Sequence, residues 1–191
     1  MRNIFPLILF FISDLSFPQS NKDVFDYMVT LNNGIYSTYR EVLRNSPKYP
    51  DCSLRIQHQL LDTAYYEYVD KNSVIHDYND FLFAIVNNGI LYIRLKKGFY
   101  KVIIRGAISI FNKELMYTYL TNGYTMSEDH IFLVDFETGN IMRLIPKTVE
   151  GILERDTLLY KEFSTLPASK KRKSLYPYIL KYNERNPILM D

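Results

Sequence analysis

The sequence predicts a single α+β domain, in which an antiparallel β-meander carries a short N-terminal helix and two to three C-terminal helices on one face. Between residues 54 and 144, short apolar runs alternate with turn sequences, which is typical of antiparallel strands joined by tight links. After Pro146 the apolar residues recur at spacings of three and four, which is the helical period. The composition agrees, because 47% apolar and 23% charged residues are typical of folded domains.

The first twenty residues have the pattern of a signal peptide. Arg2 gives a positive start, residues 4–12 are apolar apart from Pro6, and a polar stretch follows. This apolar run is too short to span a bilayer, which takes about 20 residues. The alternative is a buried strand or helix of the mature fold. We expect cleavage near Ser20, an extracytoplasmic location (periplasmic or secreted), and one domain over residues 21–191 without a transmembrane segment.

A short helix is expected between residues 39 and 44. Thr38 and Glu41 have the spacing of a capping box, in which the Thr hydroxyl accepts from the Glu amide and the Glu carboxylate reaches back to the Thr amide. The helix should end before Pro47, because proline disfavours a helical conformation in the residue that precedes it.

The strongest hairpin signal lies at Asn88-Gly89, between apolar runs at residues 81–86 and 90–95. An Asn-Gly pair suits a type I′ turn, which requires positive φ at both central residues. A turn at residues 96–98 leads into a strand over 99–105, and Gly106 is expected to mark a bulge or bend. Further strands are expected at residues 107–111, 115–120, 130–136 and 140–144, the last two joined by a turn at 137–139.

The C-terminal third is expected to form the helices. Pro146 opens the first, Asp156 caps the second, and the last runs from about residue 174 to 184 with Pro177 in its first turn. The first carries Val149, Ile152 and Leu153 on one face, and the second bears Leu158, Leu159 and Phe163. The last has Leu175, Tyr178, Ile179 and Tyr182 at spacings of three and four.

A basic run, Lys170 to Lys173, precedes the last helix. Nucleic-acid binding is not expected, because 23 Lys and Arg against 21 Asp and Glu leave a net charge of only +2. We interpret the run as the exposed start of the last helix. Positive charge there opposes the helix dipole, a mild cost that leaves room for an anionic partner such as a lipid headgroup or a surface glycan.

No residues in the sequence predict a catalytic, cofactor-binding or metal-binding site. Cys52 is the only cysteine, which excludes an intramolecular disulfide, and its surroundings do not mark a nucleophile paired with His58, His76 or His130. Two sets of oxygen and imidazole groups lack the spacing of known metal sites: Asp70, His76, Asp77 and Asp80, and Glu128, Asp129, His130 and Asp135. Nucleotide-binding loops and the nucleophile motif of α/β-hydrolases are absent as well.

Three segments resemble a group of uncharacterised exported proteins of Bacteroidota. They are residues 34–47, which begin Gly-Ile-Tyr and contain the capping box, residues 83–93 around the hairpin, and residues 99–106. The likeness covers about residues 34–111 and is weaker in the C-terminal helices. Phe83 and Val86 stand where that group often has Trp and Cys. The resemblance implies export and a shared fold, and it carries no activity or site residues with it.

The functional hypothesis is a non-enzymatic envelope or secreted module that binds a protein or an envelope ligand through its sheet or loops. The chain has 17 tyrosines, which give large contact area at low entropic cost but serve equally well to fill strands. Tyr92, Tyr100 and Arg105 are the residues considered as binders. One alternative is a small extracytoplasmic hydrolase, which needs a cleft that gathers two carboxylates, or a His and a carboxylate. Another is a structural envelope component, which would bind stoichiometrically to one fixed assembly.

Overall fold

The computed structural model describes residues 25–26, 28–60, 63–78, 82–96, 98–118 and 125–190. The predicted signal peptide and its cleavage site lie outside these residues. In the described part of the chain, an eight-stranded antiparallel sheet and five helices, four of them C-terminal to the sheet, confirm the α+β class. None of the described helices is long and apolar enough to cross a membrane.

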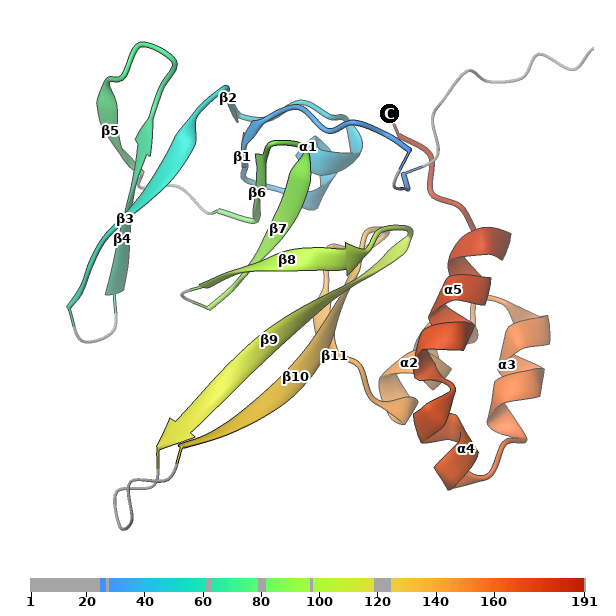
Figure 1. Ribbon diagram of the computed structural model, residues 1–191. Coiled ribbons are helices and arrows are strands. Elements are labelled where there is room, and N and C mark those ends of the chain that lie inside the picture. The colour runs from blue at the N-terminus through green and yellow to red at the C-terminus, as the bar shows by residue number, and fades with distance from the viewer. Residues whose placement is uncertain are drawn as a thin grey trace, which may run out of the picture.

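The larger sheet has the strand order β11-β10-β9-β8-β7-β6-β1-β2 (Figure 1). From β6 to β11 each strand pairs with its neighbour in sequence, which confirms the meander. The N-terminal strand β1 joins the same sheet because it pairs with β6 on one side and β2 on the other. The bounds are β1 (Gly34–Tyr36), β2 (Tyr49–Pro50), β6 (Ala84–Asn87), β7 (Ile90–Leu95), β8 (Gly98–Ile104), β9 (Ile108–Thr118), β10 (Thr125–Asp135) and β11 (Ile141–Arg143).

The predicted Asn-Gly hairpin is confirmed. Asn88 and Gly89 have φ of 51° and 73°, the two positive values that a type I′ turn requires. They connect β6 and β7, whose pairing starts at Asn87 and Ile90. The predicted bend at Gly106 is also present, at the corner between β8 and β9.

The strands predicted at residues 107–111 and 115–120 are one strand in the described part of the chain. β9 runs without a break from Ile108 to Thr118 and pairs with β10 along its whole length. The polar residues 112–114 made the sequence look like two strands. They lie beyond Phe111, the last β9 residue paired with β8, where β9 and β10 continue as a two-stranded ribbon (Figure 1). The pairing of β9 with β10 continues through these polar residues, so they do not interrupt the strand.

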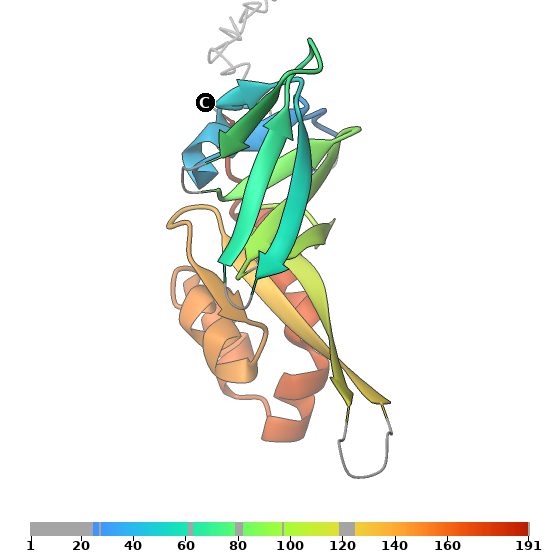
Figure 2. The ribbon, with the colours of Figure 1, turned by 90° about the vertical axis from the view of Figure 1, so that its left-hand side faces the viewer.

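A separate three-stranded sheet was not predicted. It consists of β3 (Ser53–Leu60), β4 (Thr63–Val69) and β5 (Ile75–Tyr78), in sequence order (Figure 2). It contacts the larger sheet through a small apolar cluster, in which Tyr68 of β4 packs with the buried Ile35 and Leu82.

Helix α1 (Tyr39–Leu43) begins with the predicted capping box. The amide of Glu41 donates to the Thr38 hydroxyl at 3.2 Å. The Glu41 carboxylate accepts from the amide of Ser37 at 2.7 Å, one residue earlier than the predicted partner. The helix ends one residue before the predicted Arg44, which is its C-cap.

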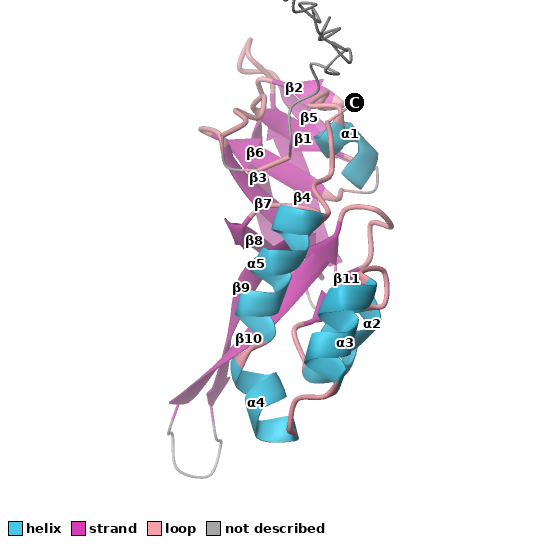
Figure 3. Cartoon of the chain, turned by 90° about the vertical axis from the view of Figure 1, so that its right-hand side faces the viewer, coloured by secondary structure: helices cyan, strands magenta, loops and turns pink. Residues whose placement is uncertain are grey.

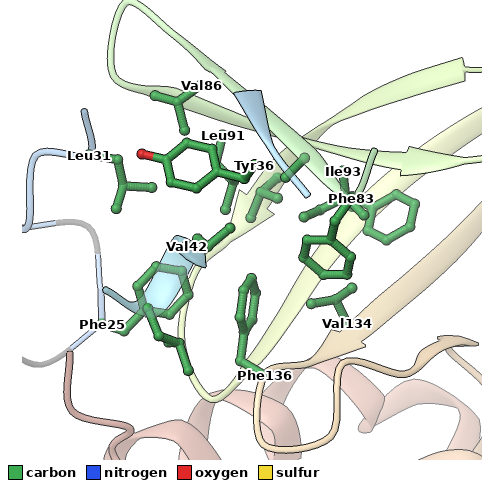
Figure 4. Close-up of a cluster of buried hydrophobic side chains, with 14 of the residues drawn as sticks. Phe25, Leu31, Tyr36, Val42, Phe83, Val86, Leu91, Ile93, Val134 and Phe136 are labelled. Carbon is green, nitrogen blue, oxygen red and sulfur yellow. The ribbon is translucent and has the colours of Figure 1, made fainter. Parts of the chain in front are cut away.

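The first hydrophobic core lies between α1, the first described residues and one face of the larger sheet (Figure 4). Its centre is aromatic: the ring of Phe136 lies 4.6 Å from that of Phe25 and 6.2 Å from that of Phe83, measured between centroids. These three side chains come from segments that are far apart in the sequence, so this core holds the N-terminal segment onto the sheet.

The helices α2 (Pro146–Leu153), α3 (Thr157–Ser164) and α5 (Leu175–Arg185) pack on the opposite face of β9 and β10 (Figure 3). Helix α4 (Ala168–Lys173) lies between α3 and α5 in the chain and adds no residue to this second core. Strand alternation explains the two cores, because Ile110 and Leu133 face the helices whereas Phe111 and Val134 face the first core. Most of the apolar helix positions named from the sequence are buried, and Tyr178 is half-buried against the same core: the buried ones are Val149, Ile152, Leu153, Leu159, Phe163, Leu175, Ile179 and Tyr182.

Of the two adjacent leucines on α3, Leu158 is 60% exposed, because it lies about 100° around the helix axis from the buried Leu159. One prediction about the helices needs correction. The basic run does not open the last helix, since it lies in α4, a separate helix that Ser174 divides from α5. The charges therefore stand in the last turn of α4, where the helix dipole favours them. The predicted cap of α3 is confirmed, because Asp156 accepts from the amides of two residues in its first turn.

Candidate ligand pocket

A pocket of about 420 Å³ lies where the first described residues meet the β8–β9 corner and the end of α5. Clefts of this size with mostly apolar walls are the usual binding sites for small molecules. The apolar wall consists of Phe25, Ile104, Ala107, Leu180, Pro187 and Ile188, and the polar groups are Asp26, Arg105, Asn183 and Glu184.

Arg105, one of the three residues considered as binders, forms a fixed part of this wall. Its Nη1 donates to the carbonyls of Asp26 at 3.0 Å and Val29 at 2.7 Å. Its Nη2 donates to the carbonyl of Gly89 at 3.4 Å, and the guanidinium carbon lies 5.7 Å from the ring centroid of Phe25. Arg105 therefore clamps the N-terminal segment to the sheet.

Asn183 fixes the opposite side of the pocket. Its Oδ1 accepts from the amide of Ile108 at 2.8 Å, and its Nδ2 donates to the carbonyl of the same residue at 2.9 Å. The amide side chain thus bonds β9 as a neighbouring strand would. Gly106 permits this approach, because a Cβ atom at that position would lie 2.5 Å from the Asn183 side chain. The two bonds hold α5 against the corner, so the pocket is formed before any ligand arrives.

Two carboxylates of the pocket have acceptor oxygens to spare. The hydrogen bonds described above use both Nη atoms of Arg105 and the amide group of Asn183, whereas Nε of Arg105 is buried without a hydrogen bond in the described part of the chain. Asp26 uses Oδ1 to accept from the amide of Met28 at 2.7 Å, which leaves Oδ2 for another donor. Glu184 is exposed and has no hydrogen-bond or ion-pair partner within the described ranges. The pocket is therefore suited to a molecule with an apolar body and a cationic or hydrogen-donating end.

The other two residues considered as binders lie elsewhere. Tyr100 stacks on Phe111 with ring centroids 6.2 Å apart, and the Lys113 ammonium lies 5.4 Å from its centroid, so it packs against the first core. Tyr92 is half-buried on β7, opposite Lys101 of β8. Neither lines the pocket.

The first set of metal-ligand candidates is only partly brought together. Nε2 of His76 lies 3.1 Å from Oδ2 of Asp70, and the His76 ring stacks on Tyr68. The other oxygen of Asp70 accepts from the amides of Asn72 and Val74 at 2.9 Å each. The amide of Val74, and next the His76 side chain, lower the pKa of the Asp70 carboxyl. The Asp70 carboxylate is thus fully engaged within its own turn and with His76. The side chain of Asp77 and the whole of Asp80 lie outside the described residues.

The second set is divided between two places. Asp135 is fully buried and pairs with Arg155 at 2.6 Å, while His130 bonds to Arg143. The side chains of Glu128 and Asp129 lie outside the description. Among the side chains that the structure describes, no three His, Cys, Asp or Glu residues gather as a metal site would require.

Cys52 has the environment of a packing residue. Its thiol donates to the carbonyl of Tyr49 at 3.0 Å, and burial raises its pKa. A cysteine nucleophile needs the opposite shift, because the thiolate is the reactive form.

Comparison of the chain with protein-family models, curated proteins and solved structures gives no match. The sequence did not predict the pocket. Its walls come from residues 25–26, 104–107 and 180–188, and the only local signal was the bend expected at Gly106 next to Arg105.

Proposed function

We propose that this chain is an exported, non-enzymatic binding module that holds a small ligand with an apolar body and a cationic end in the pocket beside Arg105. The observation that carries the proposal is a pocket with mostly apolar walls in which two carboxylates, those of Asp26 and Glu184, have acceptor oxygens to spare. A cationic ligand would satisfy these carboxylates while its body displaces water from the apolar wall.

Export is supported by the charged start and short apolar run of the first twenty residues and by the resemblance to exported proteins of Bacteroidota. The test is to express the tagged full-length chain in its native cell, to isolate the envelope fraction and to sequence the N-terminus. A start near Asn21 supports export, and an intact Met1 overturns it. The same purified sample, analysed by native mass spectrometry, reports any retained small molecule or stoichiometric partner.

Benzamidinium is a suitable probe for the pocket, because it joins an apolar ring to a planar cation. Calorimetric titration should detect its binding and should detect none for phenylacetate, which carries an anion on the same ring. The double variant Asp26→Asn/Glu184→Gln should weaken binding about tenfold, since each exposed charge pair contributes up to about 1 kcal/mol. Glu154→Gln, an exposed glutamate at the end of α2 and away from the pocket, is the matched control. Equal binding of both probes would refute the proposed ligand chemistry.

The hydrolase alternative keeps one observation in its favour, which is that Asp26 and Glu184 line the same pocket. A general acid needs a carboxyl whose pKa is raised. Hydrogen bonds lower the pKa of the Asp70 and Asp156 carboxyls, the opposite of what a general acid needs, and both lie outside the pocket. A panel of p-nitrophenyl esters and glycosides separates the two functions. Turnover that Glu184→Gln abolishes while benzamidinium still binds would establish the enzyme.

A further inference from the structure

Helix α4 has no role in either core. It spans Ala168–Lys173, and none of its residues is buried. Four of these six residues are cations: Lys170, Lys171, Arg172 and Lys173. A surface helix of a folded domain normally buries one apolar stripe, so packing does not explain this segment.

Three of the four cations are uncompensated. Lys171 is engaged, because its Nζ lies 2.8 Å from Oε1 of Glu150 and 5.4 Å from the ring centroid of Phe163. Lys170, Arg172 and Lys173 are exposed, and within the part of the chain that the structure describes they have no acidic partner. The charge is also concentrated in this region, since residues 146–190 contain nine Lys and Arg against five Asp and Glu, whereas the whole chain has a net charge of only +2.

The position of α4 suits contact with an extended surface. It lies at the end of the helical layer farthest from β1 and β2, the end toward which the β9–β10 ribbon also extends (Figures 1 and 3). None of its residues lines the ligand pocket. A row of cations on a projecting helix without an apolar stripe matches a plane of negative charges better than a single enclosed ligand.

We propose that α4 docks the protein on anionic lipid headgroups at a membrane surface. Basic clusters of this size bind such surfaces electrostatically, and each cation strengthens binding by about fivefold near the surface. The proposal is independent of the pocket and its ligand, because α4 and the pocket share no residue.

The test is sedimentation of the full chain with two kinds of vesicle, phosphatidylcholine alone and phosphatidylcholine mixed with phosphatidylglycerol. Any binding through the apolar N-terminal segment appears in both, so the difference between them measures the charge-dependent part. That part should be strong at low salt and should fall as salt is added. The triple variant Lys170→Gln/Arg172→Gln/Lys173→Gln should lose it by about a hundredfold. Since these side chains are exposed, the variant should unfold at the same urea concentration as the parent chain.

The control removes the same charge from other exposed positions of the helical layer, as Lys147→Gln/Lys161→Gln/Lys181→Gln. It should retain most of the binding. An equal loss in the two triple variants would show that net charge rather than α4 is responsible and would overturn the proposal. Binding to heparin without binding to phosphatidylglycerol vesicles would overturn the lipid assignment in favour of a glycan.

Discussion

Replacing Arg105 by Met should detach the N-terminal segment from the sheet without unfolding the domain. Met is of similar length but has no donors, so the change leaves the carbonyls of Asp26 and Val29 without the bonds of 3.0 and 2.7 Å that they now accept. A hydrogen bond from a charged donor contributes about 1.5–3 kcal/mol when buried. Arg105 is half-buried, so we take about 1 kcal/mol for each of these two bonds and about 0.5 kcal/mol for the contact with Phe25. The expected loss is therefore about 2–3 kcal/mol, against about 5–15 kcal/mol for the stability of a typical domain.

Two measurements check this prediction. Urea unfolding followed by circular dichroism gives the global loss. Hydrogen exchange at the amide of Phe25, which donates to the carbonyl of Ile188 at 2.8 Å, reports whether the segment opens first. Arg94→Met is the control, because Arg94 also donates to a backbone carbonyl, that of Lys96, but only two residues away and in an exposed place. Its loss should stay below about 0.5 kcal/mol.

A loss below about 1 kcal/mol in Arg105→Met, with unchanged exchange at Phe25, would refute the clamp. Equal losses in the two arginine variants would refute it as well, because the bonds to distant segments would then matter no more than a local one. In either case the pocket wall would owe its position to the burial of Phe25 and to the bond between its amide and the carbonyl of Ile188.

Three further predictions concern the cores and the turns. Phe136→Ala should cost about 3–5 kcal/mol in urea unfolding, since Phe136 is fully buried at the centre of the first core, and a loss under about 1 kcal/mol would contradict that position. Gly89→Ala should destabilise the protein by about 1 kcal/mol, because φ is 73° at this residue. Gly151→Ala should stabilise it by a similar amount, because Gly151 lies inside α2 with open space around the new methyl group. Melting temperatures that shift in the same direction for both variants would refute this pair of predictions. Burial, and then the nearby Glu41, raises the pKa of Tyr36, so the contribution of Tyr36 to stability is complete below about pH 10 and is lost as the pH rises further. Above that pH, the urea midpoint of unfolding should therefore fall less for Tyr36→Phe than for the parent chain. Parallel curves of midpoint against pH would contradict this.

The parts of this fold that the sequence predicted depend on neighbouring residues. The hairpin at Asn88-Gly89, the caps at Thr38 and Asp156 and the buried face of α5 each need only a few consecutive positions, because turn dihedrals, orphan amides and the helical period are local. The sequence did not distinguish Leu158 from Leu159, since two adjacent leucines fit the helical period equally well and only the packing partner decides which one is buried.

The remaining features depend on pairings between distant segments. Nothing near Gly34 indicates that β1 pairs with both β6 and β2, and nothing near Tyr68 indicates that β4 belongs to a second sheet. The pocket is the extreme case, because its walls meet only when the chain is folded. Arg105 was considered for its charge and position on the hairpin sheet, yet its three carbonyl partners, at Asp26, Val29 and Gly89, could not be read from its neighbours in the sequence.

The bond between the amide of Phe25 and the carbonyl of Ile188 also has a consequence for the order in which the protein can fold. A chain made from its N-terminus exposes Phe25 long before residue 188 exists. The hairpins of the meander can form while synthesis continues, since their contacts are local. The pocket cannot form, and the first core stays incomplete, until α5 and residues 188–190 have been added. During that interval the apolar surface that Ile188 and Met190 later cover remains open to water and to other chains. A folding helper that recognises exposed aromatic surface would therefore find its target at the face of the sheet on which α1 packs, and would be released when the last helix docks.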